Sequence, residues 1–321
     1  MTKGMNPVYL LVFPDPGPRW REALAAAAPG VELLVAGEDR EAVRLIAEAD
    51  ALYGTLTPEM LRAARRLRWV QTSMAGLERY MFPELVASSV TLTNARGLYS
   101  DVIADHVFSY ILAFARDLPR LLRAQRERRW LRQSEINTFQ LQGLTAGVVG
   151  FGGIGAEVAR RAQVVGMPVL AVDPAPHGTV EGVDVWGPER LSELLAAADF
   201  VIACAPETPE TRGLFDAERF GQMKAGARFI NVGRGRVVQL AALTAALEGG
   251  HLAGAALDVY ETEPLPADHP LWGMEQVILT PHSAAYAVPV EERRLALVVD
   301  NVRRFVAGEP LRNVVTKERW S

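Results

Sequence analysis

The sequence predicts an α/β protein made of two doubly wound parallel-sheet domains. Short apolar runs alternate with segments of helical periodicity, which is typical of βαβ units. The alternation forms two series, the first ending near residue 98 and the second beginning near residue 147. The length of 321 residues also favours two domains, because a domain has about 150 residues.

The first series contains the strands and helices of one expected sheet. Apolar runs predict strands at residues 8–13, 31–36, 51–54, 68–72 and 90–94. Helical spacing predicts helices at residues 20–27, 41–49, 58–66 and 78–87. Since helices separate the strands, the sheet is expected to be parallel.

A long apolar helix at 101–116 is expected to lead into the second series. Strands are predicted at residues 148–150, 169–172, 200–203, 228–231, 255–259 and 277–280. Helices are predicted at residues 154–165, 189–197, 216–223, 238–248 and 291–306. The last helix is expected to cross back to the first domain. The expected division is residues 1–98 with 288–321 in one domain, and 99–287 in the other.

Composition and charge exclude several classes of protein. Thirty-four Lys and Arg against 38 Asp and Glu give a net charge of −4, so nucleic acid is not an expected partner. No apolar run approaches the roughly 18 residues of a membrane span, and the apolar stretch near the N-terminus is too short for a secretory signal. The single cysteine, Cys204, excludes an intramolecular disulfide and a multi-cysteine zinc site. A cytoplasmic protein without a metal site is expected.

Seven arginines and two acidic residues lie between residues 116 and 132. The cluster has two interpretations: a patch that binds an anion or nucleic acid, or a solvated or interface helix end, where cations suit the helix dipole. The second is preferred, because Trp130 is the only aromatic residue among them.

The sharpest local motif is a glycine-rich turn between a predicted strand and a predicted helix. It reads Gly150-Phe-Gly152-Gly-Ile-Gly155 and has the GxGxxG spacing of dinucleotide-binding turns. The first glycine allows the tight turn, the second lets the backbone approach a pyrophosphate, and the third packs helix against strand. Backbone N–H groups at the helix N-terminus would bind the phosphates.

Asp173 ends the next predicted strand, 18 residues after Gly155. A carboxylate at this place is typical of proteins that bind the ribose hydroxyls of NAD, and it repels the 2′-phosphate of NADP. NAD is therefore favoured over NADP, although His177 could weaken the preference. A turn residue before Pro174 is the alternative interpretation of Asp173.

Four segments of the second series resemble signatures of the D-isomer-specific 2-hydroxyacid dehydrogenase family. They are the cofactor turn 144–155, the Pro-Thr loop 205–213, the Asn-x-x-Arg-Gly segment 231–238, and residues 256–264 followed by 279–282. The resemblance extends to Thr93-Asn94 and to the helix start at 103–106. It implies a Rossmann cofactor domain inserted into a flavodoxin-like substrate domain. It also implies hydride transfer between NAD(H) and a small 2-oxoacid of the glyoxylate or hydroxypyruvate class, and a homodimer built largely on the long helix after residue 100.

The resemblance implies a catalytic set of Arg234, Glu263 and His282, each just after a predicted strand. His282 would donate a proton to the carbonyl oxygen, since imidazole titrates near neutral pH. Glu263 would accept a hydrogen bond from the other ring nitrogen and raise the pKa of the ring. Arg234 would hold the substrate carboxylate with its fork of donors. Glu261 competes for the role of Glu263, which is preferred because the family's glutamate directly precedes a proline.

Binding residues follow from the same resemblance. The backbone N–H groups of Ala75 and Gly76 would bind the substrate carboxylate, with a plain strand-to-helix turn as the alternative. Asp258 would face the nicotinamide carboxamide. The implied cofactor set is Gly150, Gly152, Gly153, Ile154, Gly155, Asp173, Ala205, Pro206, Thr211, Val232, Gly233 and Asp258. Arg234 and His282 complete the implied substrate set.

Two residues of reactive type are expected to be structural. His106 is expected to be a packed, hydrogen-bonded helix residue, and Cys204 a packed residue at a strand end.

Three positions depart from the family pattern. Gly153 stands where Arg or Gln is frequent, Asp105 where Glu is usual, and Glu207 where Leu is common.

Two other functions stay open. One is an NAD-sensing regulator, because corepressors related to the family keep its fold and catalytic residues. The other is an enzyme that oxidises another small anion, such as phosphite or formate. The family's formate enzymes typically have Gln where Glu263 stands, which argues against formate.

Overall fold

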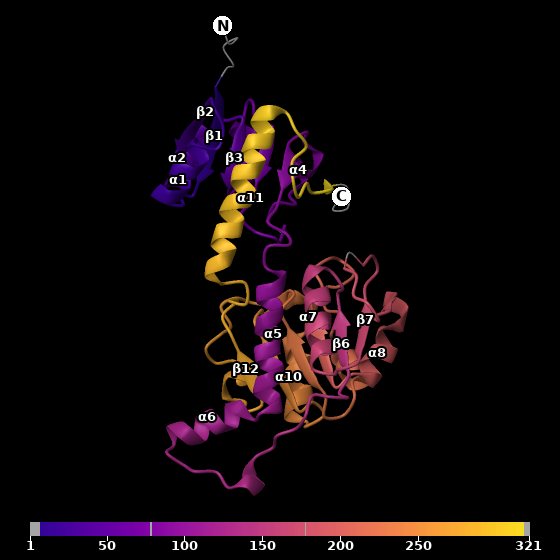
Figure 1. Cartoon of the computed structure of the whole chain (residues 1–321). Helices are drawn as coiled ribbons and strands as arrows, with labels where there is room; N and C mark the ends of the chain where they lie inside the picture. Colours follow the sequence, from indigo (N-terminus) through magenta and orange to yellow (C-terminus); the bar gives the residue numbers. More distant parts are fainter. Residues whose placement is uncertain (1–6, 78, 177, 318–321) are drawn as a thin grey trace. The chain divides into compact units, whose positions relative to one another are not determined.

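The computed structural model describes residues 7–77, 79–176 and 178–317, which fold as two compact units (Figure 1). Unit 1 comprises residues 1–98 and 287–321, and unit 2 comprises residues 99–286. Each unit is built on one parallel β-sheet, which confirms the predicted fold class. Residues 1–6, part of the stretch judged too short for a secretory signal, and His177 lie outside the described residues.

Unit 1 has a five-stranded sheet covered by helices on both faces. The strand order is β2-β1-β3-β4-β5, the doubly wound order of flavodoxin-like domains. Residues of α1 and α11 pack on one face, and residues of α2, α3 and α4 on the other. The strands are β1 Val8–Phe13, β2 Val31–Val35, β3 Ala51–Gly54, β4 Trp69–Gln71 and β5 Thr91–Thr93. The helices are α1 Pro18–Ala25, α2 Asp39–Leu45, α3 Pro58–Ala63, α4 Pro83–Ala87 and α11 Val288–Ala307.

Unit 2 has a seven-stranded sheet in the order β12-β11-β10-β9-β6-β7-β8, which extends the Rossmann order by one strand. Residues of α5 and α7 pack on one face, and residues of α8, α9 and α10 on the other. The strands are β6 Ala146–Val149, β7 Val169–Val172, β8 Val185–Trp186, β9 Phe200–Ala203, β10 Arg228–Asn231, β11 Gly254–Leu257 and β12 Val277–Leu279. The helices are α5 Ser100–Ala115, α6 Leu118–Arg126, α7 Gly153–Val164, α8 Leu191–Ala197, α9 Ala217–Gln222 and α10 Leu240–Glu248.

The arginine-rich segment after α5 forms a separate helix, α6, which the sequence did not predict. Asp117 adopts a left-handed φ of 54° between the two helices, so the chain changes direction there. In Figure 1, α6 and the segment after it project from the sheet of unit 2. Four of the seven arginines lie outside α6, next to its ends.

The shortest elements also differ from prediction. Strand β8 has two residues, too few to show a period. Helix α4 covers only the second half of the helix expected at 78–87, and proline opens it. Short 3₁₀ turns, which the sequence did not reveal, occupy Gln133–Glu135, Pro188–Arg190, Gly235–Val237 and Pro270–Gly273.

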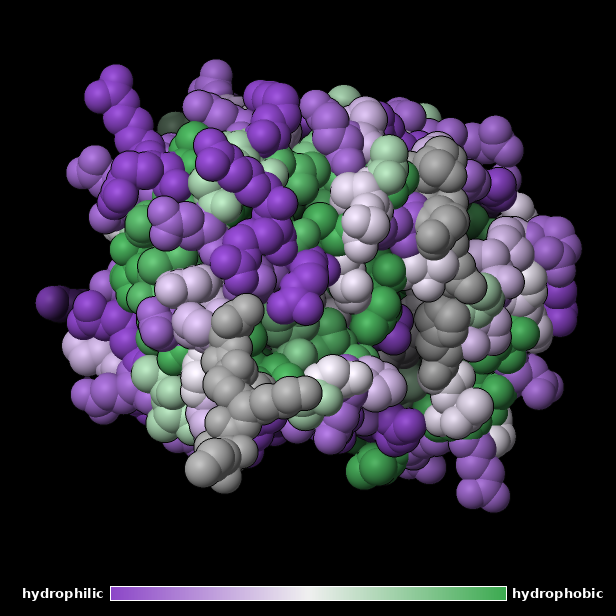
Figure 2. Space-filling view, turned by 90° about the horizontal axis from the view of Figure 1, so that it is seen from above, coloured by the Kyte–Doolittle hydropathy of each residue, from purple (hydrophilic) through white to green (hydrophobic). Residues whose placement is uncertain are grey.

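The described helices include none that is both long and apolar enough to cross a membrane. On the face seen in Figure 2, hydrophilic residues predominate and apolar residues form small groups between them.

Candidate active site

The glycine-rich turn connects β6 to α7, and packing explains the need for two of its glycines. A Cβ on Gly150, whose φ is +96°, would lie 2.6 Å from the backbone nitrogen of Ala205. A Cβ on Gly155 would lie 2.3 Å from the carbonyl oxygen of Gly150. Any side chain at these two positions would therefore meet backbone.

Gly152 is different, because a Cβ there would meet nothing within 4 Å. No side chain caps the N-terminus of α7 that follows it, so N–H groups of its first turn stay available to a ligand. A Cβ on Gly153 would lie 2.5 Å from the hydroxyl of Ser100. Ile154 packs against the buried core of unit 2. An open second glycine and an uncapped helix fit the pyrophosphate of a dinucleotide.

Asp173 lies directly after β7 and is tied to the glycine-rich turn. Its Oδ2 accepts a hydrogen bond of 2.7 Å from the backbone N–H of Phe151, and its Oδ1 accepts one of 2.7 Å from that of Ala175. The carboxylate is half-buried. Both interpretations of Asp173 therefore stay compatible: it shapes the turn, and each oxygen has a further lone pair for a ribose hydroxyl.

The loops after β9 and β10 form the next part of the site. Ala205 and Val232 are buried there, and a Cβ on Gly233 would lie 2.5 Å from the carbonyl oxygen of Ala205. Thr211 closes its own loop, because its hydroxyl donates a hydrogen bond of 2.6 Å to the carbonyl oxygen of Pro206.

Glu207, one of the departures from the family pattern, is neutralised locally. Its Oε1 accepts a hydrogen bond of 2.8 Å from Arg212 and lies 3.9 Å from Arg236. The acidic substitution therefore adds an ion pair to this loop rather than an unpaired charge.

His282 and Glu263 are hydrogen-bonded to each other. His282 Nδ1 lies 2.8 Å from Glu263 Oε2, and the histidine side chain is 52% exposed. The other carboxylate oxygen of Glu263 accepts a hydrogen bond of 3.1 Å from the backbone N–H of Tyr260. Glu261 points elsewhere: it accepts a hydrogen bond of 2.7 Å from the backbone N–H of Leu240, at the start of α10. The structure thus pairs His282 with Glu263 and not with Glu261.

Arg234 follows β10, the neighbour of β11 in the sheet. Its Nη1 donates a hydrogen bond of 2.7 Å to the carbonyl oxygen of Gly233. Its own carbonyl oxygen accepts one of 3.1 Å from the side chain of Asn231. Gly235 allows this turn to touch the segment after β11, because a Cβ there would lie 1.8 Å from the carbonyl oxygen of Tyr260.

The three strands that precede Arg234, Glu263 and His282 are β10, β11 and β12, which are neighbours in one parallel sheet. Their carboxyl ends lie at the same edge, which is where open α/β sheets bind ligands. The arrangement places a cation, a carboxylate and an imidazole along one edge of unit 2.

Asp258 is buried directly after β11. Its carboxylate accepts three hydrogen bonds, from the hydroxyl of Thr280 at 2.5 Å and from the backbone N–H groups of Ser283 at 2.8 Å and Ala284 at 2.9 Å. Asp258 therefore holds both sides of the turn that carries His282. Its expected contact with a carboxamide stays a prediction.

His106 is a packed, hydrogen-bonded residue of α5, as predicted. Its Nε2 lies 2.7 Å from the hydroxyl of Tyr110 and 3.2 Å from that of Thr280. Burial lowers the pKa of the ring, and the nearby carboxylate of Asp258 partly opposes this shift. The ring is therefore neutral at neutral pH.

Cys204 lies at the carboxyl end of β9 and packs against the core of unit 2. The residue is half-buried, and loss of solvent around the thiol raises its pKa to about 12. A thiol with so high a pKa is a poor nucleophile at neutral pH, which agrees with the predicted packing role.

A family model described as "D-isomer specific 2-hydroxyacid dehydrogenase, NAD binding domain" matches residues 108–284, more than half of the chain. This chain belongs to the D-isomer specific 2-hydroxyacid dehydrogenase family. Its unit 2 is accordingly an NAD-binding domain of the Rossmann type, as predicted.

Individual relatives of this dehydrogenase-family chain support the same family assignment. D-3-phosphoglycerate dehydrogenase of Mycobacterium tuberculosis is 37% identical over 295 residues, which cover 89% of this chain and 55% of that protein. The chain thus spans about half the length of that relative. Glyoxylate reductase of Korarchaeum cryptofilum is 35% identical over 86% of this chain and 85% of that protein.

A solved structure from the same family covers nearly the whole chain. It is the D-isomer specific 2-hydroxyacid dehydrogenase of Xanthobacter autotrophicus in complex with NADPH and MES. It has 34% sequence identity and a TM-score of 0.82, and it covers 98% of this chain and 100% of that one.

In unit 1 of this dehydrogenase-family chain, the predicted substrate loop follows β4. The side chain of Asn94 donates a hydrogen bond of 2.9 Å to the carbonyl oxygen of Ala75. The hydroxyl of Thr72 accepts one of 2.8 Å from the backbone N–H of Met74. Ala75 and Gly76 are half-buried. These two hydrogen bonds fix the backbone of the loop around Ala75.

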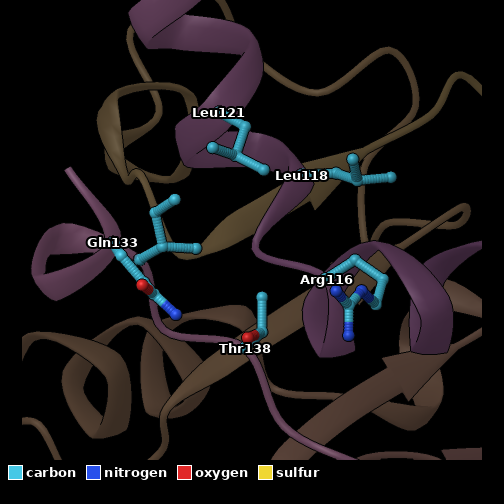
Figure 3. A pocket seen from close by; sticks show the side chains of 6 residues that line it. Arg116, Leu118, Leu121, Gln133 and Thr138 are labelled. Carbon is cyan, nitrogen blue, oxygen red and sulfur yellow. The ribbon is translucent and has the colours of Figure 1, made fainter. Parts of the chain in front are cut away.

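A hollow of about 560 Å³ in unit 2 is lined by none of the predicted site residues. Figure 3 shows Leu118 and Leu121 of α6 around it, with Gln133 and Thr138 of the segment that follows. Arg116 and Ile136 complete its lining.

No cluster of three or more side chains able to hold a metal ion occurs within residues 7–77, 79–176 and 178–317.

Thr280 and Tyr110 lie near the candidate site, and the sequence analysis did not assign them a role. Thr280 lies in the signature segment 279–282, but nothing there indicated its hydrogen-bond partners, and the signal for Tyr110 was its i, i+4 spacing from His106 on one helix.

Proposed function

We propose that the chain is an NAD-dependent reductase that converts a small 2-oxoacid of the glyoxylate or hydroxypyruvate class into the D-2-hydroxyacid. The observation that carries the proposal is the 2.8 Å pair of His282 and Glu263 at the same sheet edge as Arg234. Reduction of a carbonyl needs a proton donor and an anchor for the substrate carboxylate, and these residues supply both.

Each residue has one task in this proposal. His282 gives its Nε2 proton to the carbonyl oxygen, because its Nδ1 is engaged with Glu263. Glu263 accepts a hydrogen bond from Nδ1–H and so fixes the orientation of the ring. Arg234 binds the substrate carboxylate and polarises the carbonyl.

The residues of the glycine-rich turn would hold the cofactor, which supplies the hydride when bound. Gly152 leaves the approach for the pyrophosphate open, and Asp173 would accept from the ribose hydroxyls. Since the Asp173 carboxylate would repel a 2′-phosphate, we propose NAD rather than NADP. The related structure from X. autotrophicus was solved with NADPH, so the preference needs a direct test.

We propose that unit 1 is the substrate domain. The backbone N–H groups of Ala75 and Gly76 would bind the substrate carboxylate, since small residues let a ligand reach the backbone. The hydrogen bonds from Asn94 and to Thr72 keep this loop in one conformation.

We also propose that the protein is a homodimer. Four apolar side chains on and around α6 are strongly exposed: Leu112 at 45%, Leu118 at 41%, Leu122 at 52% and Trp130 at 92%. A second copy would cover this surface. Light scattering should give twice the chain mass, and the double variant Leu118→Glu/Leu122→Glu should give the mass of one chain.

The decisive experiment for the reaction is kcat/KM over a short panel of 2-oxoacids with NADH and with NADPH. The panel includes glyoxylate and hydroxypyruvate, and D-3-phosphoglycerate is tested in the oxidative direction. The proposal expects the highest kcat/KM for one of the two small oxoacids with NADH. NADH binding without turnover of any member would overturn it.

A further inference from the structure

A series of four polar side chains connects helix α5 to the turn that carries His282. His106 Nε2 lies 2.7 Å from the hydroxyl of Tyr110, and this hydroxyl forms a short hydrogen bond with the hydroxyl of Thr280. The Thr280 hydroxyl donates a hydrogen bond of 2.5 Å to Asp258. The series thus joins two segments that are 174 residues apart in sequence.

The donor and the acceptor of each hydrogen bond in this series can be assigned by starting from Asp258. The Asp258 carboxylate only accepts, so the proton of the Thr280 hydroxyl points to it. Thr280 then accepts from the Tyr110 hydroxyl, and Tyr110 in turn accepts from His106 Nε2–H. Burial raises the pKa of Tyr110 and lowers that of His106. The three donors are therefore neutral, and Asp258 carries the only charge.

The far end of the series fixes the backbone on both sides of His282. Asp258 accepts from Thr280 before it and from the N–H groups of Ser283 and Ala284 after it. His282 itself has a left-handed φ of 52°, a conformation that a non-glycine residue keeps only when its surroundings enforce it. The hydrogen bonds to Asp258 supply that constraint.

Tyr260 connects the same turn to Glu263. Its hydroxyl lies 2.9 Å from the carbonyl oxygen of Thr280, and its backbone N–H donates to Glu263 Oε1. The partner of the imidazole and the turn that carries the imidazole are therefore held by one buried tyrosine.

We propose that His106, Tyr110 and Thr280 are positioning residues, which act through Asp258 to hold the His282 ring in register with Glu263. The inference rests on the proposed function, in which His282 is the proton donor. Helix α5 thereby contributes to the chemistry through hydrogen bonds to the turn that carries His282.

The test compares Thr280→Val, which has the same shape without the hydroxyl, with Thr280→Ser, which keeps the hydroxyl. Ser109→Ala is the control, because Ser109 lies on α5 with its hydroxyl bonded to its own helix. Thr280→Val should lower kcat about 10-fold or more, as expected for a displaced catalytic group. Thr280→Ser should recover most of this loss, and Ser109→Ala should match the unaltered protein.

The nitrogen NMR signals of the His282 ring provide a readout that does not depend on turnover. They should shift in Thr280→Val and stay unchanged in Ser109→Ala. A Thr280→Val protein with normal kcat and normal ring signals overturns the inference, even if its melting temperature falls. If Thr280→Val does not fold, Tyr110→Phe, which removes the preceding donor, takes its place with the same two outcomes.

Failure of the proposed function would look different. In that case the unaltered protein turns over no 2-oxoacid with either cofactor. The ring signals of His282 then decide the inference alone: a shift in Thr280→Val supports positioning, and unchanged signals contradict it.

Discussion

At the scale of single residues, two glutamates two positions apart have separate tasks. Glu263 contacts His282, whereas Glu261 accepts from the N–H of Leu240 at the start of α10. Sequence spacing left both candidates open, and the choice of Glu263 depended on the proline that follows it. The structure supplies the physical distinction.

Alanine at each glutamate should therefore give opposite results. Glu263→Ala should lower kcat by about 10²-fold, the usual size of an acid–base contribution, with little change in stability. Glu261→Ala should cost about 1 kcal/mol of stability, as for a lost helix cap, with kcat unchanged. Steady-state kinetics and urea unfolding of the two variants measure this contrast, which a kcat loss in Glu261→Ala would refute.

His106 should make stability depend on pH. Burial lowers its pKa in the folded state, so the unfolded chain binds this proton more readily. The stability linked to the neutral ring is present above about pH 6.5, the ordinary pKa of histidine, and is lost as the pH falls below it. The melting temperature should fall more between about pH 7.5 and about pH 5.5 for the unaltered protein than for His106→Gln. Equal decreases would argue against this assignment.

Contacts between side chains far apart in sequence could not be predicted from the sequence. The contact of His106 with Thr280 spans 174 residues, and no periodicity or spacing reports such a pair. The motifs placed Arg234, Glu263 and His282 after predicted strands, because strand ends can be read from local pattern. Which side chains meet beyond those ends depends on strand order and on backbone angles such as that of His282.

At the scale of elements, packing in the β6–turn–α7 unit requires the first and third glycines of the motif, Gly150 and Gly155, and leaves Gly152 open. The GxGxxG spacing predicted both packing roles, and the role of Gly152 toward a pyrophosphate stays a prediction. Helix α6 and strand β8 were missed, since the break at Asp117 is a backbone conformation and two residues show no period.

Alanine substitutions in the turn should separate these roles. Gly155→Ala meets backbone at 2.3 Å and should cost roughly 1–3 kcal/mol of stability through overpacking. Gly152→Ala meets nothing within 4 Å, so it should fold normally and bind NADH about 10-fold more weakly, because the methyl group blocks the pyrophosphate. Thermal unfolding and NADH fluorescence titration distinguish the two. Normal NADH affinity in Gly152→Ala would contradict the assigned role.

At the scale of the whole molecule, residues from both ends of the sequence build the core of unit 1. The side chain of Asn301 in α11 is buried and donates a hydrogen bond of 2.8 Å to Gln71 Oε1, at the end of β4. Its Oδ1 accepts one of 2.8 Å from the backbone N–H of Arg312. Gln71 is the first residue of the predicted substrate loop, which runs from residue 71 to residue 78. The C-terminal helix is thus tied to the base of that loop.

Asn301→Leu should therefore destabilise unit 1. It leaves the backbone N–H of Arg312 without its partner and removes one of the two donors to Gln71 Oε1, so the loss of stability should be about 1–3 kcal/mol. Urea unfolding followed by tryptophan fluorescence measures the loss, since Trp69 belongs to the same hydrogen-bonded group through Thr93. Unchanged stability would show that this network contributes little to the fold.

The central claim is that His282 donates the proton in an NADH-dependent reduction. Its most direct test is the kcat of glyoxylate and hydroxypyruvate reduction by the unaltered protein and by His282→Gln, with the NADH dissociation constant measured for both. The account predicts turnover by the unaltered protein, a loss of about 10³-fold in the variant, and equal NADH affinity. Undiminished turnover by His282→Gln would contradict it.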